Sequence, residues 1–302
     1  MSSHHSPAEL TSVPVAHAGR RGQSARDRDI IPARAGFLLP AVSLWWRELV
    51  RFYRQPSRWV GVLLSPLVFW LVIGSGLGRS FRAGGAGDGG GGGGGYLEYF
   101  FPGTLILILL FTSIFCMMSV IEDRREGFLL SVLVSPAPRA SLVMGKVMGG
   151  TTLALLQGVL FLLLAPTVGI KPGLVRGFEL FGIMFLIAFG LTALGFCIAW
   201  RLDSTHGFHA LVNLLLIPMW LLSGALFPFS GASPWVGWLM RLNPLTYGVA
   251  ALRQALYASE PRAVVEVASF ATSITITALF AAVVFFIALL MASHKERADH
   301  TG

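Results

Sequence analysis

Six apolar runs, each about as long as a bilayer crossing requires, constrain this chain more than any other feature. Of its 302 residues, 54% are hydrophobic and only 13% are charged, a balance that soluble domains do not have. The pattern predicts an all-α integral membrane protein with six transmembrane helices. The runs are residues 59–77, 100–121, 146–168, 178–200, 209–229 and 268–291.

Lysine and arginine are distributed unevenly between the connecting segments, which predicts the orientation. The N-terminal segment, the loops after the second and fourth runs and the C-terminal segment hold 16 of the 23 basic residues. Positive charge favours the cytoplasmic side, so we expect both termini in the cytoplasm and the protein in the inner (plasma) membrane. The expected organisation is a disordered cytoplasmic tail at 1–36, a six-span domain at 37–293 and a cytoplasmic tail at 294–302. The net charge of +8 thus reflects topology, and no nucleic-acid partner is expected.

Residues 37–58 precede the first run and combine an apolar face with a basic one. Leu44, Trp45, Leu49 and Phe52 recur at helical spacing, and arginines recur every three or four residues on another face. This pattern predicts an amphipathic helix in the plane of the inner interface, with its arginines among lipid phosphates. The arginines are Arg47, Arg51, Arg54 and Arg58.

The longest charged loop between two runs spans residues 122–146. Its first five residues are charged and follow directly on the apolar run that ends at Ile121, so they mark the point where the chain meets water. The apolar segment 128–134 is too short to cross a bilayer, and the Ser-Pro-Ala-Pro sequence at 135–138 ends it. We therefore expect a short helix lying at the membrane surface.

The last outer loop, 230–267, is too apolar at 234–253 for a solvated loop. Two short helices separated at Asn243-Pro244 fit this segment, the first bearing Trp235 and Trp238 at interfacial depth. A re-entrant gate, a dimer contact and a plain interfacial cap all remain open, because non-helical backbone within a membrane must be buried in protein or line a cavity. The candidate gate residues are Trp235, Trp238, Asn243, Pro244, Tyr247 and Arg253.

Polar residues inside the runs are few and mild, and ionisable ones are essentially absent. Gln157 and Asn213 are candidates for a substrate path, although an interhelical hydrogen bond explains each more simply. The chain also lacks the Gly-x-x-x-x-Gly-Lys-Ser/Thr pattern of a phosphate-binding loop, since Val147 follows Gly145-Lys146. We therefore expect this chain to bind no cofactor and to have no ATP site of its own.

Several motifs occur together in a fixed order. Glu-Asp-Arg-Arg-Glu-Gly at 122–127 is followed by Ser-Pro-Ala-Pro-Arg at 135–139 and Gly145-Lys146, and Asn-Pro-Leu-Thr-Tyr at 243–247 precedes Ala-Leu-Arg at 251–253. With six spans and the N-terminal amphipathic helix, the chain resembles the permease subunit of ABC-2 type exporters over residues 37–291. It looks most like the daunorubicin-resistance and multidrug branch, and it is also similar to lipo-oligosaccharide and polysaccharide export permeases.

The resemblance implies a half-transporter in which two permease copies, here a homodimer, pair with two copies of a separate ABC ATP-binding subunit. The cargo would be hydrophobic or amphipathic, such as a drug, a lipid or a lipid-linked glycan. ATP would bind only to the partner, and the chain would not be an enzyme by itself. The loop after the second span would carry a cytoplasmic coupling helix. The residues implied in coupling are Glu122, Asp123, Arg124, Arg125, Glu126, Gly127, Pro136 and Arg139.

Three other classes of protein remain as alternatives. An ATP-independent secondary carrier would need an intramembrane acid, a lysine or an ion-coordinating cluster, which the apolar runs lack. An intramembrane serine enzyme would need Ser223 beside His206 or His209, which precede it by more than ten residues of a predicted helix. A structural membrane anchor protein is the third class.

Overall fold

The computed structural model describes residues 36–54, 56–83, 95–135, 137–170, 174–257 and 267–299, and every regular element within them is helical. The predicted all-α class is therefore confirmed. The long helices are α2 (Pro56–Ala83), α3 (Gly95–Cys116), α6 (Arg139–Leu162), α7 (Leu174–Arg201), α8 (Thr205–Leu221) and α11 (Phe270–Asp299). The short ones are α1 (Leu38–Tyr53), α4 (Met118–Arg125), α5 (Phe128–Val134), α9 (Pro234–Leu242) and α10 (Pro244–Leu256), with 3-10 turns η1 (Ala165–Val168) and η2 (Phe229–Gly231).

Four helical stretches in the described part of the chain are long and apolar enough to cross a membrane. They are Tyr96–Arg125, Arg139–Leu162, Arg176–Arg201 and Phe270–Ser293. Two shorter apolar stretches, Leu64–Gly76 in α2 and Thr205–Leu221, overlap the first and fifth predicted runs. The positions of the six runs thus agree with helices, whereas the count of six crossings stays a prediction.

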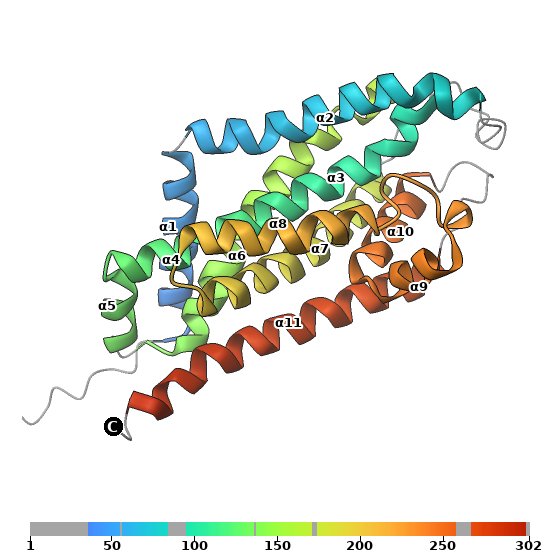
Figure 1. The fold of residues 1–302 in the computed structure, drawn as a ribbon. Helices are drawn as coiled ribbons and strands as arrows, with labels where there is room; N and C mark the ends of the chain where they lie inside the picture. The colour runs from blue at the N-terminus through green and yellow to red at the C-terminus, as the bar shows by residue number, and fades with distance from the viewer. Residues whose placement is uncertain are drawn as a thin grey trace, which may run out of the picture.

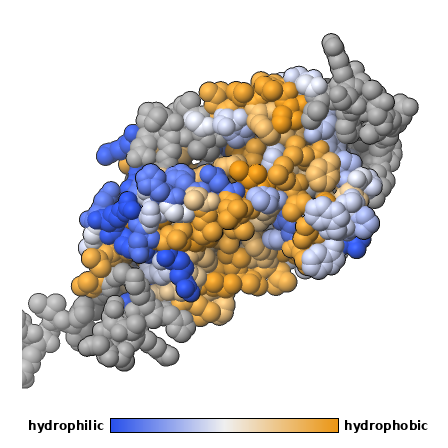
Figure 2. Space-filling model, viewed as in Figure 1, coloured by the Kyte–Doolittle hydropathy of each residue, from blue (hydrophilic) through white to orange (hydrophobic). Residues whose placement is uncertain are grey.

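The long helices lie side by side, and the short ones gather at the two ends of the bundle (Figure 1). Helices α1, α4 and α5 lie at one end of the bundle. We call these three helices and the turn between α7 and α8 the charged end. The α9–α10 hairpin lies at the other end. Hydrophobic side chains cover the middle of the bundle, while hydrophilic ones collect towards its ends (Figure 2). This distribution is typical of a membrane protein.

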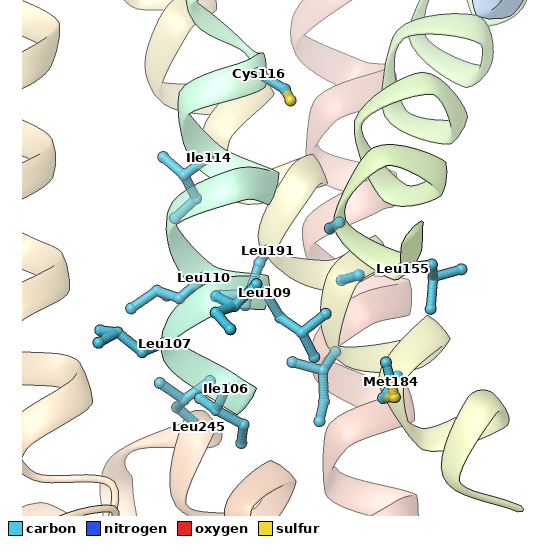
Figure 3. Packing of buried hydrophobic residues seen from close by; sticks show 14 of the residues in the cluster. Ile106, Leu107, Leu109, Leu110, Ile114, Cys116, Leu155, Met184, Leu191 and Leu245 are labelled. Carbon is cyan, nitrogen blue, oxygen red and sulfur yellow. The ribbon is translucent and has the colours of Figure 1, made fainter. Parts of the chain in front are cut away.

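Helix α3 forms the centre of the bundle and packs against α2, α6, α7 and α10. In the Tyr96–Arg125 stretch, 83% of the most apolar window is buried, compared with 22% in α11. Its leucines and isoleucines lie beside Leu191 of α7 and Leu245 of α10, in a buried cluster that also includes Leu155 of α6 (Figure 3). Because α3 is packed against other helices on several sides, its apolar residues are spread around the whole helix and do not gather on one face.

Small residues let the core helices approach closely. A Cβ on Gly195 of α7 would lie 3.0 Å from the Cα of Ile114 in α3, and one on Gly150 of α6 would lie 2.7 Å from Thr192 Cγ2 in α7. Side chains at these positions would therefore push α3, α6 and α7 apart.

Candidate functional site

The charged motif at 122–127 forms the last turn of α4 and the reversal into α5. The amide of Glu126 donates to Glu122 O at 2.9 Å, and that of Gly127 donates to Arg124 O at 3.2 Å. Gly127 then adopts φ 76°, a left-handed conformation that residues with a Cβ rarely occupy. Glycine at this position therefore ends α4 and redirects the chain into the short apolar helix α5, as the sequence predicted.

The two acidic residues of α4 hold the N-terminal helix α1. Asp123 is fully buried and receives both guanidinium nitrogens of Arg47, at 2.9 and 2.8 Å, as well as Arg51 Nη1 at 2.9 Å. Arg51 Nη2 also lies 2.9 Å from Glu122. The hydrogen bond to Asp123 raises the pKa of the Arg47 guanidinium, so this group carries its charge throughout the physiological range.

The amphipathic helix predicted before the first run is present as α1. Arg47 and Arg51 on its basic face bind carboxylates of the same chain, whereas the placement of its arginines among lipid phosphates stays a prediction. Helical periodicity identified the basic face, yet it gave no information on which element that face meets. Arg54 is exposed, and the side chain of Arg58 lies outside the described residues.

Lys146 connects this network of ion pairs to α6. The Lys146 ammonium donates to Glu48 Oε1 of α1 at 2.5 Å, to Ser119 Oγ of α4 at 3.1 Å and to Asp123 Oδ2. Lys146, Asp123 and Glu48 expose 0%, 0% and 4% of their surface. We call Glu48, Asp123 and Lys146 the buried ion triad.

Sequence reasoning did not identify Glu48, Ser119 or Lys146 as site residues. One signal was available: Glu48 lies four residues after Leu44 and four before Phe52, within the stripe that packs on the rest of the protein. An acidic residue in an apolar stripe requires a buried partner. Lys146 stood at the first position of a predicted run and was interpreted as the boundary of that run.

Helix α1 seats on α6 with almost no space between the two backbones. A Cβ on Gly145 would lie 2.6 Å from Ala41 O, and one on Gly149 would lie 2.7 Å from Glu48 Cβ. Trp45 Nε1 adds a hydrogen bond to Thr152 Oγ1 at 3.0 Å. The two glycines flank Lys146 by one and three residues, so they allow its short contact with Glu48.

The two arginines of the motif point to a different element, the end of α7. Arg124 Nη2 donates to Trp200 O at 2.8 Å and its Nη1 to the Asp203 carboxylate at 2.6 Å, while Arg125 Nε donates to Asp203 O at 3.1 Å. The last carbonyls of a helix have no partner within the helix, and cationic side chains are favourable there. The acidic half of the motif therefore binds α1, and its basic half binds the turn between α7 and α8.

Helix α5 leaves part of its apolar surface uncovered at the charged end. Phe128 packs under the Arg47 guanidinium, which lies 3.7 Å from the ring centre, and Leu129 is buried. Leu130 and Val134, one turn apart on one face, are 63% and 87% exposed. Arg139 opens α6 and donates to Ala292 O of α11 at 3.2 Å, whereas Pro136 lies outside the described residues.

The hairpin end contains the two short helices expected on either side of Asn243-Pro244. Asn243 Oδ1 accepts from Leu245 N at 3.0 Å and so caps α10, in which Pro244 takes the first position. Its Nδ2 donates to Met219 O of α8 at 2.6 Å. Trp235 and Trp238 are exposed on α9.

Two side chains of α10 likewise donate to backbone carbonyls, here in the loop that follows α8. Thr246 Oγ1 donates to Leu222 O at 3.2 Å and Arg253 Nη2 to Gly224 O at 3.1 Å. Tyr247 instead bonds within the hairpin, to Arg241 O at 2.8 Å. The candidate gate residues thus include the exposed Trp235 and Trp238, the buried Asn243 and Arg253, which donate to carbonyls at and after the end of α8, and Tyr247, which bonds within the hairpin.

The two candidate substrate-path residues have different surroundings and are not brought together. Gln157 is buried and accepts a 2.5 Å hydrogen bond from Thr112 Oγ1, which joins α6 to α3; its Nε2 has no hydrogen-bond partner among the described atoms. Asn213 lies exposed on α8. The geometry therefore gives Gln157 the interhelical hydrogen bond that was the simpler of its two interpretations.

The geometry does not form the serine-histidine pair of an intramembrane enzyme. His206 and His209 lie in the first turns of α8, whereas Ser223 follows its end and donates to Trp220 O at 2.6 Å. Within the described ranges, no group of three histidine, cysteine, aspartate or glutamate side chains could hold a metal ion.

Comparison with known proteins decides the family. Residues 41–257, from the first turn of α1 to the end of α10, match the model of the ABC-2 type transporter. The chain belongs to the ABC-2 type transporter family. It is 26% identical over 210 residues to the transport permease named ycf38 of Cyanophora paradoxa, covering 68% of this chain and 70% of the relative.

Another ABC-2 relative supports the resemblance to the drug-resistance branch. The daunorubicin resistance ABC transporter permease protein DrrB1 of Streptomyces coeruleorubidus is 23% identical over 267 residues, which is 83% of this chain and 86% of the relative. The ycf38 permease of Porphyra purpurea is 23% identical over 209 residues. The chain is therefore a multi-pass membrane permease of the ABC-2 type.

Proposed function

We propose that this permease is the membrane-spanning subunit of an ATP-driven exporter and that α5 is its coupling helix, which docks on a separate ABC ATP-binding subunit. The observation that carries the proposal is the exposure of Leu130 and Val134 at the charged end, next to a rigidly bonded motif. Apolar side chains on a short helix outside the predicted spans favour burial in a partner's groove.

The charges of the motif contribute mainly by holding α5 in place. Asp123, Arg124 and Arg125 are engaged within the chain, and Glu126, with 61% of its side chain exposed, is the acid most available to a partner. This assignment refines the coupling role expected for residues 122–127. ATP would bind and be hydrolysed on the partner, two copies of which would serve two permease copies.

A double substitution of Leu130→Asp and Val134→Asp tests the coupling helix. Two carboxylates on the docking face would have to be desolvated, so we expect co-purification of the ATP-binding subunit to fall by about tenfold or more. Ser131→Asp is the matched control, because Ser131 is an exposed residue of the same helix on another face. The measurement is the ratio of the two subunits recovered in detergent from the native host.

Either of two results would contradict the proposal. Equal loss with Ser131→Asp would indicate a general effect of charge on α5. Wild-type chain that never captures an ATP-binding subunit would favour the secondary carrier or the structural anchor. Loss confined to the Leu130 and Val134 variant supports the exporter.

We also propose that two copies of the permease meet over α8. This helix buries only the narrow stripe Phe208, Val212, Leu216 and Trp220. Beyond His209 its remaining surface is apolar, yet it bears the exposed amide of Asn213 roughly 12 Å along the axis from Thr205. An amide facing lipid is unfavourable, whereas amides of paired helices hydrogen-bond to each other or line a hydrated path.

Asn213→Cys tests this interface in a background with Cys116 and Cys197 replaced by alanine. If Asn213 lies near the two-fold axis, a short bifunctional thiol reagent is expected to yield a cross-linked dimer in native membranes, because residues near the axis of a symmetric interface face their own copies. Phe286→Cys on α11 is the control, since it is also exposed but α11 packs on α7, α10 and α6. Equal cross-linking at both positions, or at neither, would argue against α8 as the interface.

The cargo that fits best is hydrophobic or amphipathic. The exposed surfaces of α2, α8 and α11 are apolar, and a relative in this family is named for daunorubicin resistance. We place the protein in the inner membrane with both termini in the cytoplasm, so that the charged end faces the ATP-binding subunit.

A further inference from the structure

The buried ion triad at the charged end joins three helices that sequence places far apart. Glu48 comes from α1, Asp123 from α4 and Lys146 from α6. We propose that these three are positioning residues that lock α1, α4 and α6 into one unit with the coupling helix, so that displacement of α5 reaches the bundle. The inference rests on the proposed function. Within that function, it assigns to the triad the contact that transmits the motion of α5 to the bundle.

Stability alone does not account for the triad. Removing charges from water costs several kcal/mol per ion, and well-packed hydrophobic residues of similar volume often serve as well or better. A buried ion network does contribute a defined geometry, because its groups accept few alternative partners. The triad is therefore better explained by the arrangement it enforces than by the stability it adds.

The hydrogen bonds of Lys146 and Asp123 leave no spare capacity. The ammonium of Lys146 has three donors and meets three acceptors, on Glu48, Ser119 and Asp123. The Asp123 carboxylate has about four acceptor positions and receives four N–H groups, two from Arg47 and one each from Arg51 and Lys146. Any shift of α1 against α4 or α6 would break at least one of these bonds.

The triad is connected to α5 through Arg47. Arg47 bonds Asp123 and at the same time lies 3.7 Å over the ring of Phe128, the first residue of α5. On the other side, Gly145 and Gly149 keep α1 in backbone contact with α6. Force on α5 thus passes through Arg47 to Asp123 and from there to Lys146.

The other connection that leaves the motif contains one exposed partner. Arg124 and Arg125 bond backbone carbonyls of Trp200 and Asp203, and the Asp203 side chain that pairs with Arg124 is 87% exposed. Exposed ion pairs contribute little and rearrange readily, so the ion pair of this connection is weaker than the buried pairs of the triad. This connection holds the turn between α7 and α8, whereas the triad holds α1 and α6.

The double variant Glu48→Leu with Lys146→Met tests the inference. It removes one acid and one base together and leaves Asp123 paired with Arg47 and Arg51, so no buried charge loses all its partners. A fluorophore on Ser230→Cys, an exposed site just before α9, reports motion at the far end. The assay adds ATP to the purified complex with its ATP-binding subunit, in a background with Cys116 and Cys197 replaced by alanine.

We expect the ATP-dependent emission change in the double variant to fall by about fivefold or more, while ATP hydrolysis stays within about twofold of wild type. A triad with only a structural role would lower the yield of complex and leave the emission change per complex intact. An undiminished change in the double variant, or its absence in the wild type, overturns the inference. Failure of the ATP-binding subunit to co-purify with the wild type would instead refute the proposed function.

Ser119→Ala provides the second variant, in case the double variant does not reach the membrane. It removes one of the three acceptors of Lys146 without leaving a charge unpaired. The emission change is expected to fall by about twofold or more at unchanged ATP hydrolysis. An unchanged signal in Ser119→Ala would overturn the inference on its own.

Discussion

Replacing Lys146 alone with methionine is expected to destabilise the permease by about 3–5 kcal/mol, the usual cost of removing one partner from a buried ion pair. The variant leaves the Glu48 carboxylate, 4% exposed, with only an Arg47 nitrogen at 3.9 Å, and it removes one of the four donors to Asp123. The measurement is the temperature at which half of the protein leaves the monodisperse peak in detergent. It should fall far below that of the wild type.

The double variant Glu48→Leu with Lys146→Met removes both members of the ion pair, whereas Lys146→Met alone leaves Glu48 without its main partner. Because it removes the stranded carboxylate as well, it should recover most of the stability that Lys146→Met loses. A double variant as unstable as the single one would mean that Lys146 contributes by packing and that its charge is secondary.

Helix α1 illustrates what the sequence could predict about the charged end. Its helical periodicity and its basic face were readable, because both depend on spacing within one segment. Its docking on α6 was not, since it depends on Gly145 and Gly149, which are distant in sequence. For the same reason, Glu48 and Lys146 were recognisable only as charges that would require partners.

The hairpin end shows a similar division. The break at Asn243-Pro244 was predicted because proline disfavours helix in the residue before it. The end of α8 at Leu221 was missed, since the apolar run continues to residue 229. There the chain leaves the helix through Gly224 at φ 82°, and the loop is held by side chains of α10 and α3 that local sequence does not reveal.

Replacing Asn243 with alanine is expected to cost about 2–4 kcal/mol, because it removes two interactions at once. The α10 N-terminus loses its cap, and the Met219 carbonyl loses its donor. The helical donor to that carbonyl would be Ser223 N, which bonds to Trp220 O instead at 3.1 Å. A carbonyl left unsatisfied within the bundle has no water to replace Asn243.

Asn243→Ser separates the two interactions. Serine can still accept from the α10 backbone, but its side chain is too short to reach Met219 O as the asparagine amide does. The half-loss temperature in detergent should therefore decrease in the order wild type, Asn243→Ser, Asn243→Ala. Equal temperatures for the serine and alanine variants would assign the whole effect to the bond with Met219. Three equal temperatures would mean that the hairpin is held without Asn243, and the gate assignment would then move to Thr246 and Arg253.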